Sequence, residues 1–190
     1  MVEPEPERSF LRGLPVAQAA VVWAVQQHAG QRREADGAAF VAHPMEVASL
    51  VAGSDYPDHV VAGAVLHDVL ENTDARVEDI EARFGSDVAR LVEAVSDDPS
   101  LSDEDERKNE LRERVRQADG DVLAVYAADK VSKVREIRIA LTAGVPRDAV
   151  EHKLRWHRES LVMLQQRMPD SHIVELLHRE LETFDRAQPR

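Results

Sequence analysis

The sequence has no cysteine, which excludes disulfide bridges, zinc ribbons and thiol-based catalysis. Aromatic residues make up only 4% of the chain, and glycine and proline are few, which disfavours a sheet-rich fold with many turns. Because thiolates are missing, any bound metal ion must depend on histidine and carboxylate ligands. The lack of cysteine also fits a reducing compartment, so we expect a cytoplasmic protein.

Long hydrophobic runs are missing too, and no stretch approaches the roughly 20 apolar residues of a membrane span. The opening MVEPEPERSF is acidic and proline-rich, unlike a signal peptide, and it predicts a disordered acidic leader over residues 1–13. The net charge of −12 argues against a nucleic-acid polymer as partner, because such partners are bound through clustered Lys and Arg. We expect no membrane partner either. A small anionic substrate is compatible with a locally basic site.

The residues that dominate instead are Ala, Val, Leu, Glu, Arg and Asp, a composition typical of helices. Apolar spacing and helix-ending glycines predict helices over residues 16–28, 43–52, 57–72, 78–84, 87–95, 104–118, 121–143, 146–168 and 171–186. The length suits a single hydrophobic core. We therefore predict one all-α domain, a bundle of about eight or nine helices over residues 14–188. This prediction leaves the oligomeric state open. The helix over 104–118 is highly charged, and we expect it to be a solvated helix with a thin apolar stripe.

Two adjacent polar residues, His67 and Asp68, interrupt apolar faces of the predicted helix 57–72. The residues that share those faces are Val60, Val61, Gly63, Ala64 and Val65. A buried carboxylate beside an imidazole is costly unless it is compensated, and a divalent cation would compensate it. The alternative is a neutral histidine that is hydrogen-bonded to the aspartate in a helix-packing contact.

Asp129 is a similar anomaly, since it ends an apolar stripe formed by Val122, Val125 and Tyr126. His43 stands immediately before Pro44 at the start of a predicted helix, so its side chain could point past the helix end into a cavity. The alternative for His43 is an exposed loop histidine.

Together these residues fall within four segments that match a known family. The segments are HAGQRREADGAAFVAHPMEVA (28–48), AGAVLHDVLENT (62–73), IEARFGSDVARLVEAVS (80–96) and VYAADKVSKVR (125–135). Their order resembles the HD-domain hydrolases, and specifically the alarmone hydrolase domain of stringent-response synthetase/hydrolases and their small stand-alone relatives. The resemblance covers roughly residues 16–138 and is weaker near 154–164.

The resemblance implies an all-α HD fold in which one divalent ion, typically manganese, is held by His43, His67, Asp68 and Asp129. Two imidazoles and two carboxylates also suit manganese, iron or zinc on chemical grounds. Such a set leaves coordination positions open, where the ion can acidify a water and polarise a phosphoryl oxygen.

Glu71 and Asn72 are the predicted catalytic residues. Glu71 lies one helical turn beyond His67 and Asp68, where it could orient or deprotonate the attacking water; the alternative is a surface glutamate. The family motif usually ends in Glu-Asp-Thr, whereas this chain has Glu71, Asn72 and Thr73. An asparagine can hold a water but cannot accept its proton.

Four cationic residues flank the predicted ligands in the sequence: Arg32, Arg33, Lys130 and Lys133. Their positions predict a basic rim around the site that could bind phosphate groups. The resemblance implies that Arg33 packs against the purine base of the alarmone and that His157 lies on its ribose side. After the last ligand the family pattern is Asp-Arg-Leu-His-Asn, so Lys133 replaces an asparagine.

Each predicted substrate contact has a structural alternative. Lys130 could lie on a solvated helix face, Lys133 could extend along its helix to solvent, and His157 could be a surface histidine. For Arg135 and Arg138 we expect a solvated face.

The resemblance predicts a manganese-dependent guanosine-3′,5′-bis(diphosphate) 3′-pyrophosphohydrolase, that is, a small alarmone hydrolase. One alternative is an HD phosphohydrolase that acts on another nucleotide. A second alternative is a catalytically weak nucleotide-binding HD protein, which Asn72 and Lys133 would favour.

Overall fold

The computed structural model describes residues 6–186. Its elements are η1 (Pro6–Leu11), α1 (Pro15–Gln27), α2 (Ala42–Ala52), α3 (Asp58–Leu66), α4 (Val69–Asn72), α5 (Val77–Phe84), α6 (Ser86–Val95), α7 (Glu104–Gln117), α8 (Gly120–Thr142), α9 (Asp148–Arg167) and α10 (His172–Arg186). Within this range β-pairing is limited to one isolated antiparallel bridge between Arg32 and Ala39. The predicted all-α class is confirmed.

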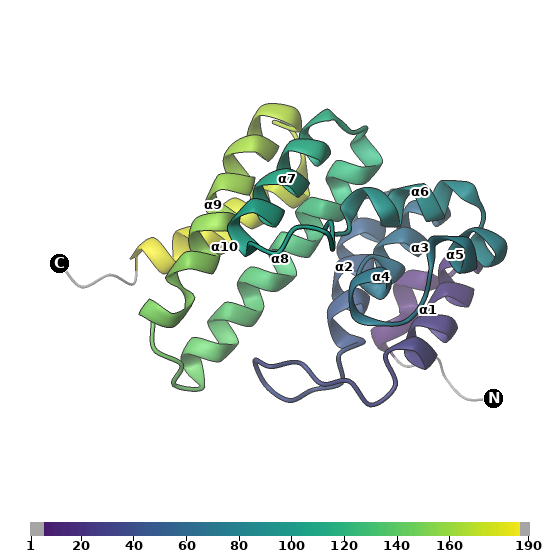
Figure 1. Cartoon of the computed structure of the whole chain (residues 1–190), viewed down its shortest axis with the longest axis horizontal. Coiled ribbons are helices and arrows are strands. Elements are labelled where there is room, and N and C mark those ends of the chain that lie inside the picture. The colour runs from purple at the N-terminus through teal and green to yellow at the C-terminus, as the bar shows by residue number, and fades with distance from the viewer. Residues whose placement is uncertain (1–5, 187–190) are drawn as a thin grey trace.

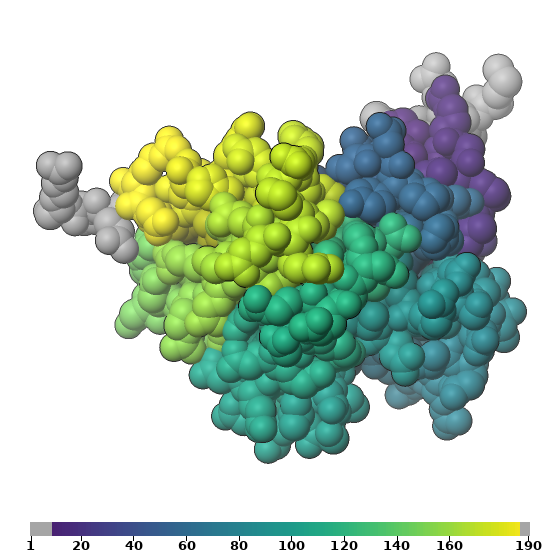
Figure 2. Space-filling view, turned by 90° about the horizontal axis from the view of Figure 1, so that it is seen from above, coloured from purple at the N-terminus to yellow at the C-terminus, as the bar shows by residue number. Residues whose placement is uncertain are grey.

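The helices form two groups on either side of α8 (Figure 1). On one side α1 and α2 pack on α3, and α2, α3 and α6 contact α8. On the other side α7, α9 and α10 contact α8. In the space-filling view the yellow residues of α10 and the purple residues near the start of the described chain lie on opposite sides of the molecule (Figure 2).

Helix α8 is buried along most of its length, because both groups cover it. Every residue from Val122 to Ser132 is buried, including the polar residues Asp129, Lys130 and Ser132. A helix buried on all sides must satisfy its polar side chains through other protein groups or ligands. The groups that contact Asp129, Lys130 and Ser132 therefore indicate where a functional site lies.

The predicted helix 57–72 is wrong as a single element, since α3 ends at Leu66 and α4 begins at Val69. His67 and Asp68 form the turn between them. His67 Nδ1 lies 2.8 Å from the Ala64 carbonyl oxygen, which is the acceptor that the Asp68 N–H would use in a continuous helix. The histidine side chain competes for this carbonyl, which loosens the helix at that point.

The predicted disordered leader over residues 1–13 is wrong from Pro6 to Leu11, which form the 3-10 helix η1. Leu11 is buried in the core, and its carbonyl oxygen accepts a hydrogen bond of 2.8 Å from Gln18 Nε2. The apolar pair Phe10 and Leu11 thus ties this segment to the domain. Residues 1–5, and the last residues of the predicted domain beyond 186, lie outside the described residues. No helix among those described is long and apolar enough to cross a membrane.

Candidate metal centre

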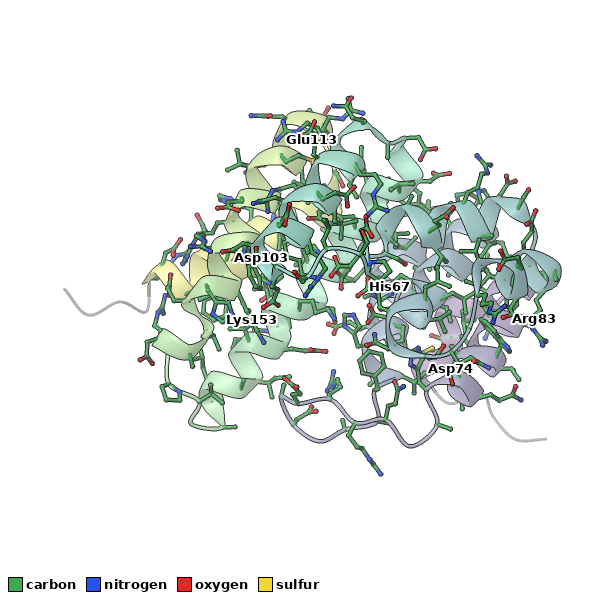
Figure 3. The ribbon with its side chains drawn as sticks, in the orientation of Figure 1. His67, Asp74, Arg83, Asp103, Glu113 and Lys153 are labelled. Carbon is green, nitrogen blue, oxygen red and sulfur yellow. The ribbon has the colours of Figure 1, made fainter. Side chains whose placement is uncertain are left out.

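The four predicted metal ligands meet where α2, α8 and the turn between α3 and α4 converge. Figure 3 shows His67 near the middle of the molecule, between the two helix groups. The Nε2 atoms of His43 and His67 are 3.1 Å apart. Asp129 Oδ1 lies 3.2 Å from His43 Nε2 and 3.5 Å from His67 Nε2. The Asp68 carboxylate lies 3.3 Å from His43 Nε2 and 3.4 Å from His67 Nε2.

The donor atoms of this cluster fit a divalent ion. His67 Nδ1 is 2.8 Å from the Ala64 carbonyl oxygen, and a carbonyl oxygen can only accept, so Nδ1 carries the proton and Nε2 directs its lone pair at the cluster. Asp68 Oδ2 and Asp129 Oδ1 are buried and have no hydrogen-bond partner among the described residues. Buried carboxylate oxygens without donors are costly, and a cation between them would remove that cost.

The protonation states agree with this interpretation. Burial acts to raise the pKa of Asp129, but Lys130, His43 and His67 hold that pKa well below its usual range. Burial and Lys133 act to lower the pKa of His43, but the carboxylates of Asp129, Glu136 and Asp68 raise it to about 9. Both carboxylates are therefore ionised, whereas His43 holds a proton near pH 7 that a bound divalent ion would displace.

Lys130 and Lys133 lie directly against the carboxylates of the two predicted aspartate ligands. Lys130 Nζ is 2.7 Å from Asp129 Oδ2 and 4.2 Å from the centre of the Tyr126 ring. Lys133 Nζ is 3.6 Å from Asp68 Oδ2. Lys130 is only 9% exposed, which rules out the solvated alternative for this residue.

A cavity of about 210 Å³ adjoins these lysines. Five cationic residues line it, against the single carboxylate of Glu104: Lys108, Arg112, Lys130, Lys133 and Lys153. Lys153 extends from α9, as Figure 3 shows, and lies one turn before His157 on the same helix face. A second cavity of about 360 Å³ shares Lys133, Lys153 and His157 and reaches Glu34 in the loop before α2.

Sequence reasoning missed Lys108 and Lys153. Their signals were present, since Lys153 lies four residues before the candidate His157, and Lys108 shares a helix face with Leu111 and Arg112. The thin apolar stripe expected on the helix over 104–118 is present as the buried residues Leu111 and Val115, and the charged Arg112 is buried beside them.

His157 forms part of the cavity wall and is not a surface histidine. It is 9% exposed, and its Nδ1 has no hydrogen-bond partner among the described residues. Burial, followed by the charge of Lys130, lowers the pKa of His157 to about 3. The imidazole is therefore neutral near pH 7 and offers a substrate a hydrogen bond rather than a charge.

Glu71 and Asn72 lie at the exposed edge of the site. Glu71 Oε1 accepts a 2.8 Å hydrogen bond from the Asp97 N–H. Partial desolvation, and then the charges of Asp68 and Asp97, raise the pKa of Glu71. Asn72 Nδ2 donates to the Asp68 carbonyl oxygen at 3.1 Å, so this amide supports the turn that carries the ligand. The catalytic roles of both residues stay predictions.

Arg32 and Arg33 point in different directions, as neighbouring residues of extended backbone do. Arg33 pairs with Asp36, and its Nη1 lies 3.7 Å from Glu136 Oε1. Because Glu136 Oε1 is also 3.4 Å from His43 Nδ1, Arg33 borders the metal centre. Arg32 is exposed, and its Nη1 lies 3.4 Å from the Gly37 carbonyl oxygen. The structure thus brings Arg33, but not Arg32, toward the ligands.

A helical bundle with buried histidine and aspartate ligands in this order defines an HD-type protein. A family model described as HD domain matches residues 20–156, and the chain belongs to this family.

The similar proteins narrow the family further. The chain is 31% identical over 139 residues to the zebrafish (Danio rerio) guanosine-3′,5′-bis(diphosphate) 3′-pyrophosphohydrolase MESH1. The aligned region covers 72% of this chain and 77% of the relative. It is 30% identical over 146 residues to the human (Homo sapiens) MESH1, covering 75% of this chain and 81% of the relative. The chain is therefore homologous to the MESH1 hydrolases.

A solved structure confirms the shared fold. It is described as a metazoan ortholog of SpoT that hydrolyzes ppGpp, and it superimposes with a TM-score of 0.80 at 24% identity, covering 97% of this chain and 98% of its own.

Proposed function

We propose that this chain is a manganese-dependent guanosine-3′,5′-bis(diphosphate) 3′-pyrophosphohydrolase. The observation that carries the proposal is a buried His/His/Asp/Asp cluster whose neighbouring lysines line a cavity. The homologous MESH1 proteins, which are named for this reaction, give further support. The absence of cysteine is compatible with a cytoplasmic enzyme.

A bound divalent ion would supply Lewis acidity, which polarises a phosphoryl oxygen and makes water a stronger nucleophile. The protein supplies its ligands from His43, His67, Asp68 and Asp129. Glu71, at the edge of the site, has a raised pKa, which suits a group that takes a proton from the attacking water and later releases it.

The phosphate contacts come from the two lysines that join the cluster to the cavity. Lys130 and Lys133 each contact a ligand carboxylate and also line the cavity. Lys108 and Lys153 add positive charge on the far walls. Such a concentration of cations in a chain with a net charge of −12 favours a substrate with several phosphate charges.

The nucleoside needs more room than the lysine-lined cavity provides. Pockets for small molecules typically span about 300 to 1,000 Å³, and the lysine-lined cavity holds only about 210 Å³. The adjoining cavity of about 360 Å³, near the loop that carries Arg33, is the place we assign to the sugar and base.

A different nucleotide substrate is the second candidate function. The observation that favours it is the position of Lys133, whose Nζ is 3.6 Å from Asp68 Oδ2, where the family has a neutral asparagine. A third candidate, a catalytically weak nucleotide-binding protein, is favoured by Asn72, because its amide is engaged with the Asp68 carbonyl oxygen.

The test is an assay of the purified, metal-stripped protein with manganese, iron or zinc against a panel of nucleotides. The proposed reaction converts guanosine 3′,5′-bis(diphosphate) and water into GDP and pyrophosphate. The Asp129→Asn variant is the matched negative control. Release of a different product from another nucleotide at higher kcat/KM would support the second candidate. Nucleotide binding without turnover under all metals would support the third.

A further inference from the structure

The metal ligand His43 has a hydrogen-bond partner behind it that fixes its tautomer. His43 Nδ1 lies 2.9 Å from Ser132 Oγ, and Ser132 Oγ donates to Glu46 Oε2 at 2.7 Å. A hydroxyl has one proton. Since Ser132 gives that proton to Glu46, its oxygen must accept from His43 Nδ1–H. The lone pair of neutral His43 is then on Nε2, which faces the other ligands.

Glu46 is itself held by a second set of charged groups. Its Oε1 accepts a 2.7 Å hydrogen bond from Arg135 Nη1, and Arg135 Nε donates at 2.6 Å to Glu180 Oε1. Arg138 pairs with the other oxygen of Glu180. Both oxygens of each glutamate are therefore engaged.

This arrangement corrects the expected solvated face for Arg135 and Arg138. Helix α10 packs on α8 and places the buried Glu180 against both arginines. Helical periodicity does not indicate this contact, because α8 and α10 are separate in the chain. Glu180 also lies beyond residues 20–156, the segment that the HD family model matches.

We propose that Glu46 is a positioning residue for His43, acting through the hydroxyl of Ser132, and that Arg135 and Glu180 hold Glu46 in place. This inference rests on the metal centre of the proposed function, but not on the identity of the substrate. A competing acceptor shows why such positioning is needed. Glu136 Oε1 lies 3.4 Å from His43 Nδ1 and has no hydrogen-bond partner among the described residues, so the ring can turn toward it when Ser132 is lost.

The test measures manganese affinity directly, by the loss of the free-ion electron paramagnetic resonance signal or by calorimetry. Groups that orient a metal ligand from behind typically contribute roughly 10- to 100-fold in metal affinity. We expect a loss of this size in Ser132→Ala and in Glu46→Ala. Glu46→Gln keeps an acceptor oxygen and should lose less, and Glu180→Gln should show a smaller loss in the same direction.

The double variant Ser132→Ala with Glu46→Ala separates positioning from a general structural effect. If Glu46 acts through Ser132, the double variant should bind manganese about as weakly as Ser132→Ala alone, because coupled residues are not additive. The matched control is Glu182→Ala, which removes another arginine-paired carboxylate of α10 and should leave affinity unchanged.

Two outcomes would overturn the inference: unchanged affinity in folded single variants, with folding checked by circular dichroism, and fully additive losses in the double variant. Wild-type protein that binds none of manganese, iron or zinc would overturn it together with the proposed function. The variants could lose metal affinity as expected while the wild type fails to hydrolyse the guanosine substrate. That result would support the inference and contradict only the proposed substrate.

Discussion

Lys130 and Asp129, which are adjacent in sequence, form a buried ion pair in which Lys130 Nζ lies 2.7 Å from Asp129 Oδ2. Adjacent helix residues do not normally face each other, and here the lysine bends over the Tyr126 ring to reach its partner. The two oxygens of Asp129 thereby have different surroundings. Oδ2 faces the lysine, whereas Oδ1 faces the two histidines and is the oxygen available to a metal ion.

Removing the charge of Asp129 should abolish the stabilisation that the metal ion provides. An ion at 100 times its Kd stabilises the folded state by about 2.7 kcal/mol, which for a chain of this size corresponds to a rise in Tm of about 5–10 °C. We expect manganese to raise the Tm of the wild type by this amount and to leave that of Asp129→Asn unchanged. Asp121→Asn, a change at a partly exposed aspartate of the same helix, is the control. An equal shift in all three proteins would contradict the assigned ligand.

Replacing Glu71 with glutamine should slow the reaction without weakening metal binding. A positioned acid/base group typically contributes roughly 100-fold or more to turnover, and glutamine keeps the shape but cannot take up a proton. Steady-state kcat, measured beside manganese affinity, tests this prediction. Glu78→Gln, an exposed glutamate of α5, should behave as wild type. Full activity in Glu71→Gln would remove this residue from the mechanism.

Lys133 should govern which nucleotide the enzyme accepts. A charged hydrogen bond contributes roughly 1.5 to 3 kcal/mol, so loss of its ammonium should weaken phosphate-rich substrates most. We expect Lys133→Asn to change the ratio of kcat/KM between guanosine 3′,5′-bis(diphosphate) and other nucleotides by several-fold or more, and Lys133→Ala to penalise the most highly charged substrate. If both variants keep the wild-type preference, Lys133 is not a specificity residue.

His157 should make the protein less stable in acid. Because burial lowers the pKa of His157 to about 3 in the folded state, and a histidine of the unfolded chain titrates near about 6.5, only the unfolded chain gains a proton between these values. The free energy of unfolding therefore falls as the pH drops through this window, by about 2 kcal/mol at pH 5.

Urea unfolding of the metal-free protein at several pH values measures this effect. Since phenylalanine does not titrate, the His157→Phe variant should lose less stability than the wild type between pH 7 and pH 5. Equal losses in the two proteins would contradict the lowered pKa.

The sequence indicated residues of the candidate metal centre because two of them violate a local pattern. Asp68 and Asp129 each interrupt an apolar helix face, and such an interruption is visible at helical spacing without knowledge of the fold. His43 has no apolar face to interrupt; its place before Pro44 left an exposed loop histidine as the alternative, and the resemblance to the HD family favoured the ligand role. Apart from η1 and the break between α3 and α4, the helix bounds were predicted to within a residue or two, because apolar periodicity is a local property.

What the sequence could not predict depends on contacts between distant segments. The break at His67 follows from one side chain that bonds to a carbonyl, and helical periodicity carries no sign of such a bond. The pairing of Arg135 with Glu46 and Glu180 requires α2, α8 and α10 to be packed together. From the sequence of α8 alone, Arg135 looks like a solvated residue, because its partners Glu46 and Glu180 belong to other helices.

The burial of α8 by both helix groups also has a consequence for cooperativity. Neither group can unfold alone without exposing the apolar residues that it buries on α8, such as Val125 and Val131. Denaturation is therefore expected to be a single all-or-none transition, even though the helices form two visible groups (Figure 1). Asp129 lies within this shared helix, so an ion bound there acts on the stability of the entire domain and not on one local segment.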